Sequence, residues 1–268
     1  MVQTWDLQTN EVKRLSDLFP GVRDPWRFRP VSQELVIGFT DRSRRLVKLN
    51  LKEQKEEARV PAGAPDCKCK RCTEESDVVM WSASRRLLVH GTWIRCGSGA
   101  GREGPVLVRR AEDLRVEAVT QIPAGLVPSA IAMSADEKCV VVGAFTDDRR
   151  EDGVVLVYDV ATGKLLRRLG VDGRYGVAVS PDGGMLAAAR KVLDKRGEEM
   201  RVEVELVDFR TGEELAVAKF PWVKVPRMEP WVAGLHWLAF SPDGKELIAS
   251  RYHDTRIWRI QRVAATER

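Results

Sequence analysis

The sequence predicts an all-β fold assembled from four-stranded antiparallel sheets, and three observations lead to this prediction. Short apolar runs that alternate with polar residues recur along nearly the whole chain, as expected of half-buried strands. Tight-turn signals rich in Gly, Pro, Asn and Asp separate these runs. The turn patterns repeat at a spacing of about fifty residues, which is typical of repeat architectures.

The first repeated pattern is a strand ending in Asp, a T-G or T-N turn, and a second strand. It appears as TWDLQTNEVKRL from Thr4, VYDVATGKLLRRL from Val157 and LVDFRTGEELAVAKF from Leu206. Gly or Asn suits this turn because each tolerates a positive φ angle. Weaker copies begin at Arg45 and Pro105. Each copy is therefore expected to form a hairpin.

The second pattern joins two apolar strands through an S-P-D-G turn, in which Pro presets φ at the second turn position. It appears as YGVAVSPDGGMLAAA from Tyr175, WLAFSPDGKELIAS from Trp237 and, less closely, SAIAMSADEKCVVVGAF from Ser129. Two further matches begin at Trp26 and Val78. The two patterns alternate along the chain, so each pair of them predicts a four-stranded antiparallel meander.

The chain resembles the WD-repeat β-propeller family, of bacterial type, through both turn patterns, the W-D pair at Trp5, the Y-D pair at Tyr158 and the segment RIWRI. This resemblance covers nearly the whole chain and implies a β-propeller of four-stranded blades. The family's Gly-His dipeptide is missing from the repeats. Only His253 and Asp254, followed by Trp258, match the family's internal Asp and Trp pair. We therefore expect packing, and not the family's hydrogen-bonded tetrad, to hold the blades together.

A single domain, 1–268, is predicted, and its strands can be lettered a to d from the axis outward. The sequence contains five a, five b, six c and five d strands: the N-terminus supplies only c and d, and the last repeat stops after c at Ile260. In one arrangement the N-terminal strands within 1–15 complete or extend the C-terminal blade, 235–262, giving about five blades with one surplus strand. In the other, the chain is an incomplete six- or seven-bladed ring whose missing strands come from a partner.

The two ends of such a meander differ in this sequence. The a–b and c–d turns share one face and are all tight, whereas the b–c and d–a connections share the other face and are long, including the b–c segment RKVLDKRGEEM. Binding residues tend to lie on loops held by a rigid scaffold, so the long-loop face is the candidate partner-binding surface. An alternative for the segment 221–234 is that it folds back as a plug over the channel. The candidate partner-binding residues are Trp222, Lys224, Arg227, Met228, Trp231, Arg149 and Arg150.

Four cysteines form a candidate metal site. Cys67, Cys69 and Cys72 lie in one d–a loop, and Cys96 begins the b–c loop of the same blade, so both loops are expected on the same face. Four thiolates can close a tetrahedral structural zinc site. The alternatives are an exposed cysteine-rich loop without metal and a redox-sensitive cluster. Cys139 lies inside a predicted strand and is expected to be an ordinary core residue.

Composition narrows the class of protein. The chain has 268 residues, of which 44% are hydrophobic and 31% charged, with a net charge of +5. Basic pairs are scattered over both faces, which argues against direct nucleic-acid binding. No apolar run approaches the roughly 18 residues of a membrane helix, and the N-terminus does not read as a signal peptide, so a cytoplasmic location is expected.

The sequence favours a non-catalytic protein-interaction scaffold that presents its b–c and d–a loop face to a protein partner and has no small-molecule substrate. With three histidines and no recognisable catalytic motif, we do not expect an enzyme. The first alternative is a subunit of a larger assembly, including a nucleic-acid-associated one, whose incomplete blade is completed by another chain. The second alternative is a propeller enzyme of the hydrolase or lactonase kind.

Overall fold

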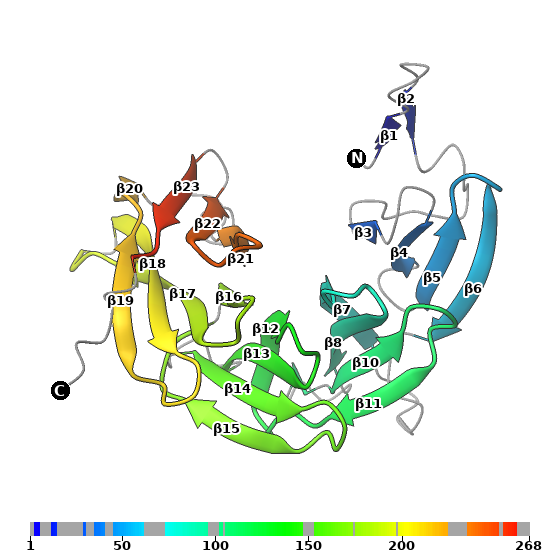
Figure 1. The fold of residues 1–268 in the computed structure, drawn as a ribbon, viewed down its shortest axis with the longest axis horizontal. Coiled ribbons are helices and arrows are strands. Elements are labelled where there is room, and N and C mark those ends of the chain that lie inside the picture. Colours follow the sequence, from blue (N-terminus) through cyan, green and yellow to red (C-terminus); the bar gives the residue numbers. More distant parts are fainter. Residues whose placement is uncertain are drawn as a thin grey trace. The chain divides into compact units, whose positions relative to one another are not determined.

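The computed structural model confirms the all-β prediction. The structure describes all residues of the chain except 1–2, 6–11, 15–28, 31–34, 41–44, 62–72, 96–101, 104, 147–152, 174, 197, 225–234, 252–253 and 262–268. The described residues form strands β1 to β23 and no helix (Figure 1). All strand pairs are antiparallel and fall into six sheets.

The first of two compact units comprises Met1–Pro128 with Ala161–Lys164 and holds one hairpin and two meanders. The hairpin is β1 (Gln3–Trp5) with β2 (Val12–Arg14). The first meander is β3 (Arg29–Pro30), β4 (Leu35–Thr40), β5 (Arg45–Asn50) and β6 (Lys55–Pro61). The second is β7 (Thr73–Trp81), β8 (Leu87–Arg95), β10 (Val106–Arg110) and β11 (Val116–Thr120), with β9 (Arg102–Glu103) paired to the end of β8.

The second unit comprises Ser129–Val160 with Leu165–Arg268. Its first meander is β12 (Leu126–Met133), β13 (Cys139–Thr146), β14 (Val154–Asp159) and β15 (Leu165–Leu169). The next is β16 (Gly176–Val179), β17 (Met185–Leu193), β18 (Glu199–Asp208) and β19 (Glu214–Lys219), with β20 (Val223–Lys224) paired to the start of β18. The last sheet has three strands, β21 (Leu235–Phe240), β22 (Glu246–Arg251) and β23 (Asp254–Arg259).

The fold is an all-β propeller with four complete four-stranded blades. The described strands match the predicted inventory, with β1 and β2 as an N-terminal c–d pair and β21 to β23 as an a–b–c sheet. The hairpin even has the register of the other c–d pairs. Trp5 is paired with Val12 as Tyr158 is paired with Leu165. The predicted completion of the 235–262 blade by the N-terminal strands stays a prediction.

The a–b turns owe their regularity to a serine. In the fourth blade, Ser180 Oγ donates to Asp182 Oδ1 at 2.7 Å and accepts a bond from Met185 N at 2.8 Å. The backbone closes when Gly183 N donates to Ser180 O at 2.9 Å, with φ of +69° at Gly183. The same three bonds recur at Ser134 and Ser241. This turn sets the strand pairing of each blade locally.

One predicted loop is a strand extension. The segment RKVLDKRGEEM was expected to be a long b–c loop, but β17 continues to Leu193 and β18 begins at Glu199. The turn between them is tight, because Asp194 N donates to Glu199 O and Glu199 N donates to Asp194 Oδ1, both at 3.0 Å. High charge suggested a loop, whereas the residues pair in register to the end of the hairpin. The b–c connection of this blade is therefore a paired hairpin closed by a tight turn.

Packing holds the β16–β19 blade and the β21–β23 sheet together. The even-numbered residues of β18 face a cluster that includes Val204, Leu247 and Ala249. Phe220, just after β19, meets Trp258 of β23 edge-to-face, with ring centroids 5.3 Å apart. The guanidinium of Arg251 lies 4.9 Å from the Phe220 ring centroid. Apolar side chains thus dominate this contact, in agreement with the expectation that packing stabilises the blades.

Candidate functional site

Two of the predicted partner-binding residues, Trp222 and Lys224, are described by the structure. Both lie on the d–a connection that leaves the fourth blade. The others, Arg227, Met228, Trp231, Arg149 and Arg150, lie outside the described residues. The four predicted zinc ligands, Cys67, Cys69, Cys72 and Cys96, lie outside them as well.

Trp222 is held at a fixed place on the long-loop end of the blade. On one side of it, Phe220 N donates to Val202 O at 2.9 Å and keeps the chain on the edge of β18. On the other side, β20 returns to the same strand, with Val223 paired to Met200. The indole nevertheless stays 39% exposed. A large apolar side chain is therefore presented to solvent from a well-anchored backbone.

Arg201 packs its guanidinium against one face of the Trp222 ring. Its guanidinium carbon lies 4.5 Å from the centroid of the Trp222 ring, within the range of a cation–π interaction. The Arg201 side chain also forms an ion pair with Glu203, which is 3% exposed. The carboxylate thus orients the guanidinium, and the guanidinium orients the indole.

Cross-strand register gathers further cations on the same face of the sheet. Arg190 and Lys219 are both paired with Glu203, on β17 and β19, and residues directly opposite each other share a face. Arg190 reaches Glu203 at 2.8 Å and Glu205 at 2.6 Å. We call the resulting set the Trp222 surface; it consists of Arg190, Arg201, Lys219, Trp222 and Lys224.

The two buried glutamates beneath this surface differ in their electrostatics. Burial alone would raise the pKa of Glu203, but hydrogen bonds from Arg190 and Arg201 outweigh it and hold that pKa below its ordinary value. Burial raises the pKa of Glu205, and the charge of Arg190 only partly offsets this effect. The paired carboxylates therefore anchor the arginines, while the exposed groups of the surface are aromatic and cationic.

Chemically, this arrangement suits recognition. Trp and Arg are enriched at the centres of protein interfaces, because they bury large areas and still make polar contacts. Among the residues that the structure describes, no group of three or more His, Cys, Asp or Glu side chains is arranged to hold a metal ion. Within the same residues, no helix has the length and apolar character needed to cross a membrane.

Trp222 was a candidate from the sequence, but the cationic residues on the same face of the sheet were not. Arg190, Arg201 and Lys219 lie on three different strands, and only the register brings them to one face. The alternation of charged and apolar residues in MRVEVELV around Arg201 was the available signal, since one side of a strand with this pattern must be polar. The loop interpretation of the neighbouring segment concealed it.

Comparison with known proteins identifies a fold and no family. No protein-family model and no curated protein matches the chain. The β-propeller domain of Myceliophteria thermophila Cps50 (Swd1) is 14% identical with a TM-score of 0.57, over 96% of this chain and 76% of that one. A putative 6-phosphogluconolactonase from Bacteroides uniformis is 16% identical with a TM-score of 0.54, over 97% and 73%.

A third similar structure is the complex of KlAtg21 with the coiled-coil of AgAtg16, which is 13% identical with a TM-score of 0.50, over 85% of this chain and 64% of that one. At identities this low, the structural similarity shows the β-propeller fold and nothing further. One of these structures is described with a coiled-coil partner, and another is described as a putative lactonase. Function must therefore be argued from the residues of this chain.

Proposed function

We propose that the protein is a non-catalytic interaction scaffold that binds a protein partner through the Trp222 surface. The observation that carries this proposal is the support of an exposed indole by a guanidinium at 4.5 Å. An indole held in this way loses little conformational entropy on binding, so more of its burial energy contributes to affinity. The solved propeller that binds a coiled-coil gives a precedent for the fold, at 13% identity.

The charges of the surface indicate the chemistry of the partner. Arg190 and Lys219 are 39% and 53% exposed in their side chains. The strand register puts them on the same face of the sheet as Arg201, which contacts Trp222. A matching segment would place an apolar or aromatic residue on the free face of the indole and acidic residues beside it. Complementary charge of this kind raises the association rate and makes binding weaker at high salt.

The test compares partner capture by the wild-type protein and two variants at one exposed residue each. Trp222→Ser removes the indole, and Leu166→Ser is the control, because Leu166 is 51% exposed and lies on the outer strand β15. Both variants should unfold at the wild-type urea midpoint. We expect recovery of a specific partner from a lysate of the source organism to fall about tenfold or more with Trp222→Ser only. Equal recovery with both variants would refute the assignment of the surface.

Trp222→Phe separates an interaction role from a general packing role. A phenyl ring keeps the apolar contact and part of the cation–π interaction, so partner recovery should lie between the wild-type and Trp222→Ser levels. Raising the salt concentration should weaken capture by the wild type more than capture by a variant in which Lys219 is replaced by Gln. If salt weakened partner capture equally in both proteins, Lys219 would not contribute to the electrostatic attraction of the partner.

A further inference from the structure

The strand β23 ends as the c strands of the complete blades do. Ile260 N donates to Lys245 O at 2.7 Å, in the a–b turn of its own sheet. The equivalent bond links Val160 N to Lys138 O at 2.8 Å, and in that blade a d strand follows, β15. In the described part of the chain, the sheet of β21 to β23 stops at β23. Its outer edge is therefore the position that a fourth strand takes in the other blades.

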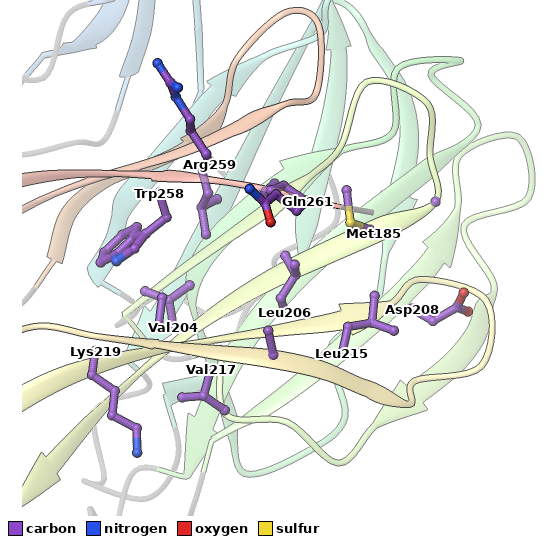
Figure 2. A pocket seen from close by; sticks show the side chains of 15 residues that line it. Met185, Val204, Leu206, Asp208, Leu215, Val217, Lys219, Trp258, Arg259 and Gln261 are labelled. Carbon is purple, nitrogen blue, oxygen red and sulfur yellow. The ribbon is translucent and has the colours of Figure 1, made fainter. Parts of the chain in front are cut away.

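An apolar groove lies beside this edge. It has a volume of about 960 Å³ and runs between β18 and β19 on one side and the end of β23 on the other (Figure 2). Its apolar lining includes Val204, Leu206, Ala218, Leu247, Trp258 and Ile260. Both walls belong to the second unit, so the groove is a feature of one compact body.

The size of the groove fits one strand. With a rise of about 3.3 Å per residue, about 4.8 Å between strands and about 10 Å between sheets, a strand residue fills roughly 160 Å³. The groove volume of about 960 Å³ thus corresponds to roughly six residues. The d strand of the preceding blade, β19, has 6 residues. Volume, length and position agree.

We propose that the outer edge of β23 and the groove form a strand-acceptor site, which takes an extended segment of a partner protein as the fourth strand of the blade. Main-chain hydrogen bonds to β23 give such a segment affinity, and alternate side chains give it specificity. The apolar lining of this site lies on the opposite face of β18 from Glu203 and Glu205, because Val204 and Leu206 alternate with them. Lys219 is the one residue of the Trp222 surface that also lines the groove. The proposal therefore goes beyond the proposed function.

The residues of β23 define the chemistry of the segment. Side chains opposite Trp258 would enter the groove and must be apolar. Side chains opposite Ile257 and Arg259 would lie on the other face, where these residues are 59% and, in its side chain, 86% exposed. A directly opposed residue of opposite charge stabilises an antiparallel pair. The expected segment is therefore antiparallel to β23, with alternating apolar residues and an acidic residue opposite Arg259.

The first measurement is amide hydrogen exchange of the purified full chain, followed residue by residue over 254–261, together with its mass in solution. A vacant edge predicts rapid exchange at alternate amides of β23 in a monomer. Slow exchange at these amides in a monomer would mean that another segment of the same chain already occupies the edge. Slow exchange in a dimer would mean that a second copy does. Either of these results would overturn the proposal.

The second measurement adds a capped ten-residue peptide in which valine alternates with glutamate. This peptide should protect the β23 amides, whereas a version with a central proline, which lacks one N–H, should not. Ala218→Trp fills the groove and should abolish protection. Arg259→Glu should weaken peptide binding about fivefold, and Arg168→Glu on β15 should leave it unchanged.

The proposal is overturned if the peptide gives no protection, or if protection persists in Ala218→Trp protein that unfolds at the wild-type urea midpoint. Replacement of glutamate by lysine in the peptide gives a further check, because the charge argument requires weaker binding to the wild type and restored binding to Arg259→Glu. Neither result depends on Trp222, so this site and the Trp222 surface can fail independently.

Discussion

Arg109 donates a hydrogen bond from Nε to Nε2 of His90 across 3.0 Å, between the neighbouring strands β10 and β8. The same guanidinium donates to Leu114 O at 2.7 Å and to Pro61 O at 2.9 Å. Arg109 is 4% exposed and His90 is fully buried. One buried cation therefore bonds to two acceptors of its own blade, His90 and Leu114, and to one acceptor on the last strand of the preceding blade, Pro61 O.

We expect Arg109→Met to destabilise the protein by about 3 kcal/mol, because two buried acceptors, His90 Nε2 and Leu114 O, and the part-buried Pro61 O would lose their donor at once. Equilibrium urea unfolding measures this change. The matched control is Arg110→Met, since Arg110 is the next residue on the same strand and makes a surface ion pair with Asp113. The control should leave the unfolding midpoint nearly unchanged. Equal effects of the two substitutions would contradict the linking role of Arg109.

The burial of His90 predicts a pH dependence of stability. Burial, and secondarily the charge of Arg109, lowers the pKa of His90 from 6.5 to about 3. The unfolded chain therefore binds a proton on this side chain between those two values, while the folded chain does not. Its contribution to stability should be complete above about pH 6.5 and should be lost progressively as the pH falls towards 3.

His90→Gln isolates this contribution, because an amide oxygen can accept the bond from Arg109 and does not titrate. We expect the stability of the wild type relative to this variant to decline as the pH is lowered from about 7 to 4, measured by urea unfolding. Nuclear magnetic resonance of the imidazole protons should show no titration of His90 near pH 6.5. A normal titration there would exclude the buried, neutral state.

The strand inventory could be predicted from sequence because its signals are local. The serine of each S-x-D turn bonds within six residues, as Ser180 does with Asp182 and Met185, so the sequence alone specifies where two strands meet. Gly163 and Gly212 have positive φ, as the T-G turns require. Such turns fix the strand order of a meander without reference to the rest of the molecule.

Side-chain relationships between strands could not be predicted in this way. His90 and Arg109 are 19 positions apart, and Arg201 meets Trp222 only because β20 returns to β18 after Phe220. Both contacts depend on the register between strands, which composition does not reveal. High charge also concealed the continuation of β17 to Leu193 and the start of β18 at Glu199, because charged residues that alternate across a hairpin resemble a loop in sequence.

The a–b turns offer a test of backbone strain. The fourth turn residue has positive φ in every described case: it is Gly183 or Gly244 in two blades, but Arg85 and Glu137, at +60° and +59°, in two others. We expect Glu137→Gly to stabilise the protein by about 0.5 kcal/mol, since relief of the left-handed strain exceeds the entropy cost of glycine. Thermal and urea unfolding measure the change.

Gly183→Ala is the reciprocal variant. A Cβ at Gly183 meets no atom within 4 Å, so any cost is conformational and not steric. It should destabilise the protein by about 1 kcal/mol. Glu137→Gly and Gly183→Ala should therefore shift stability in opposite directions. A shift in the same direction would contradict the idea that a non-glycine residue is strained at this turn position.

The zinc prediction rests on the ladder that flanks the cysteines. Thr73 and Arg95 are paired at one end of β7 and β8. In the sequence, Cys72 immediately precedes Thr73 and Cys96 immediately follows Arg95. Because consecutive Cα atoms are about 3.8 Å apart, we predict that these two thiols can reach a common metal ion, with Cys67 and Cys69 as the remaining ligands.

Metal content and free-thiol titration of protein purified without added metal or chelator test this prediction. We expect about one equivalent of zinc, lost in Cys67→Ser and in Cys96→Ser alike, because a closed tetrahedral site needs all four ligands. Cys139→Ser is the control and should keep the metal, since Cys139 is half-buried in β13 and burial raises the pKa of its thiol. If Cys96→Ser protein kept its zinc, the ligands would lie in the 67–72 loop. The pairing of β7 with β8 would then play no part in forming the site. Freely reacting thiols at Cys67, Cys69, Cys72 and Cys96, together with no bound metal, would reduce the cluster to an exposed cysteine-rich loop.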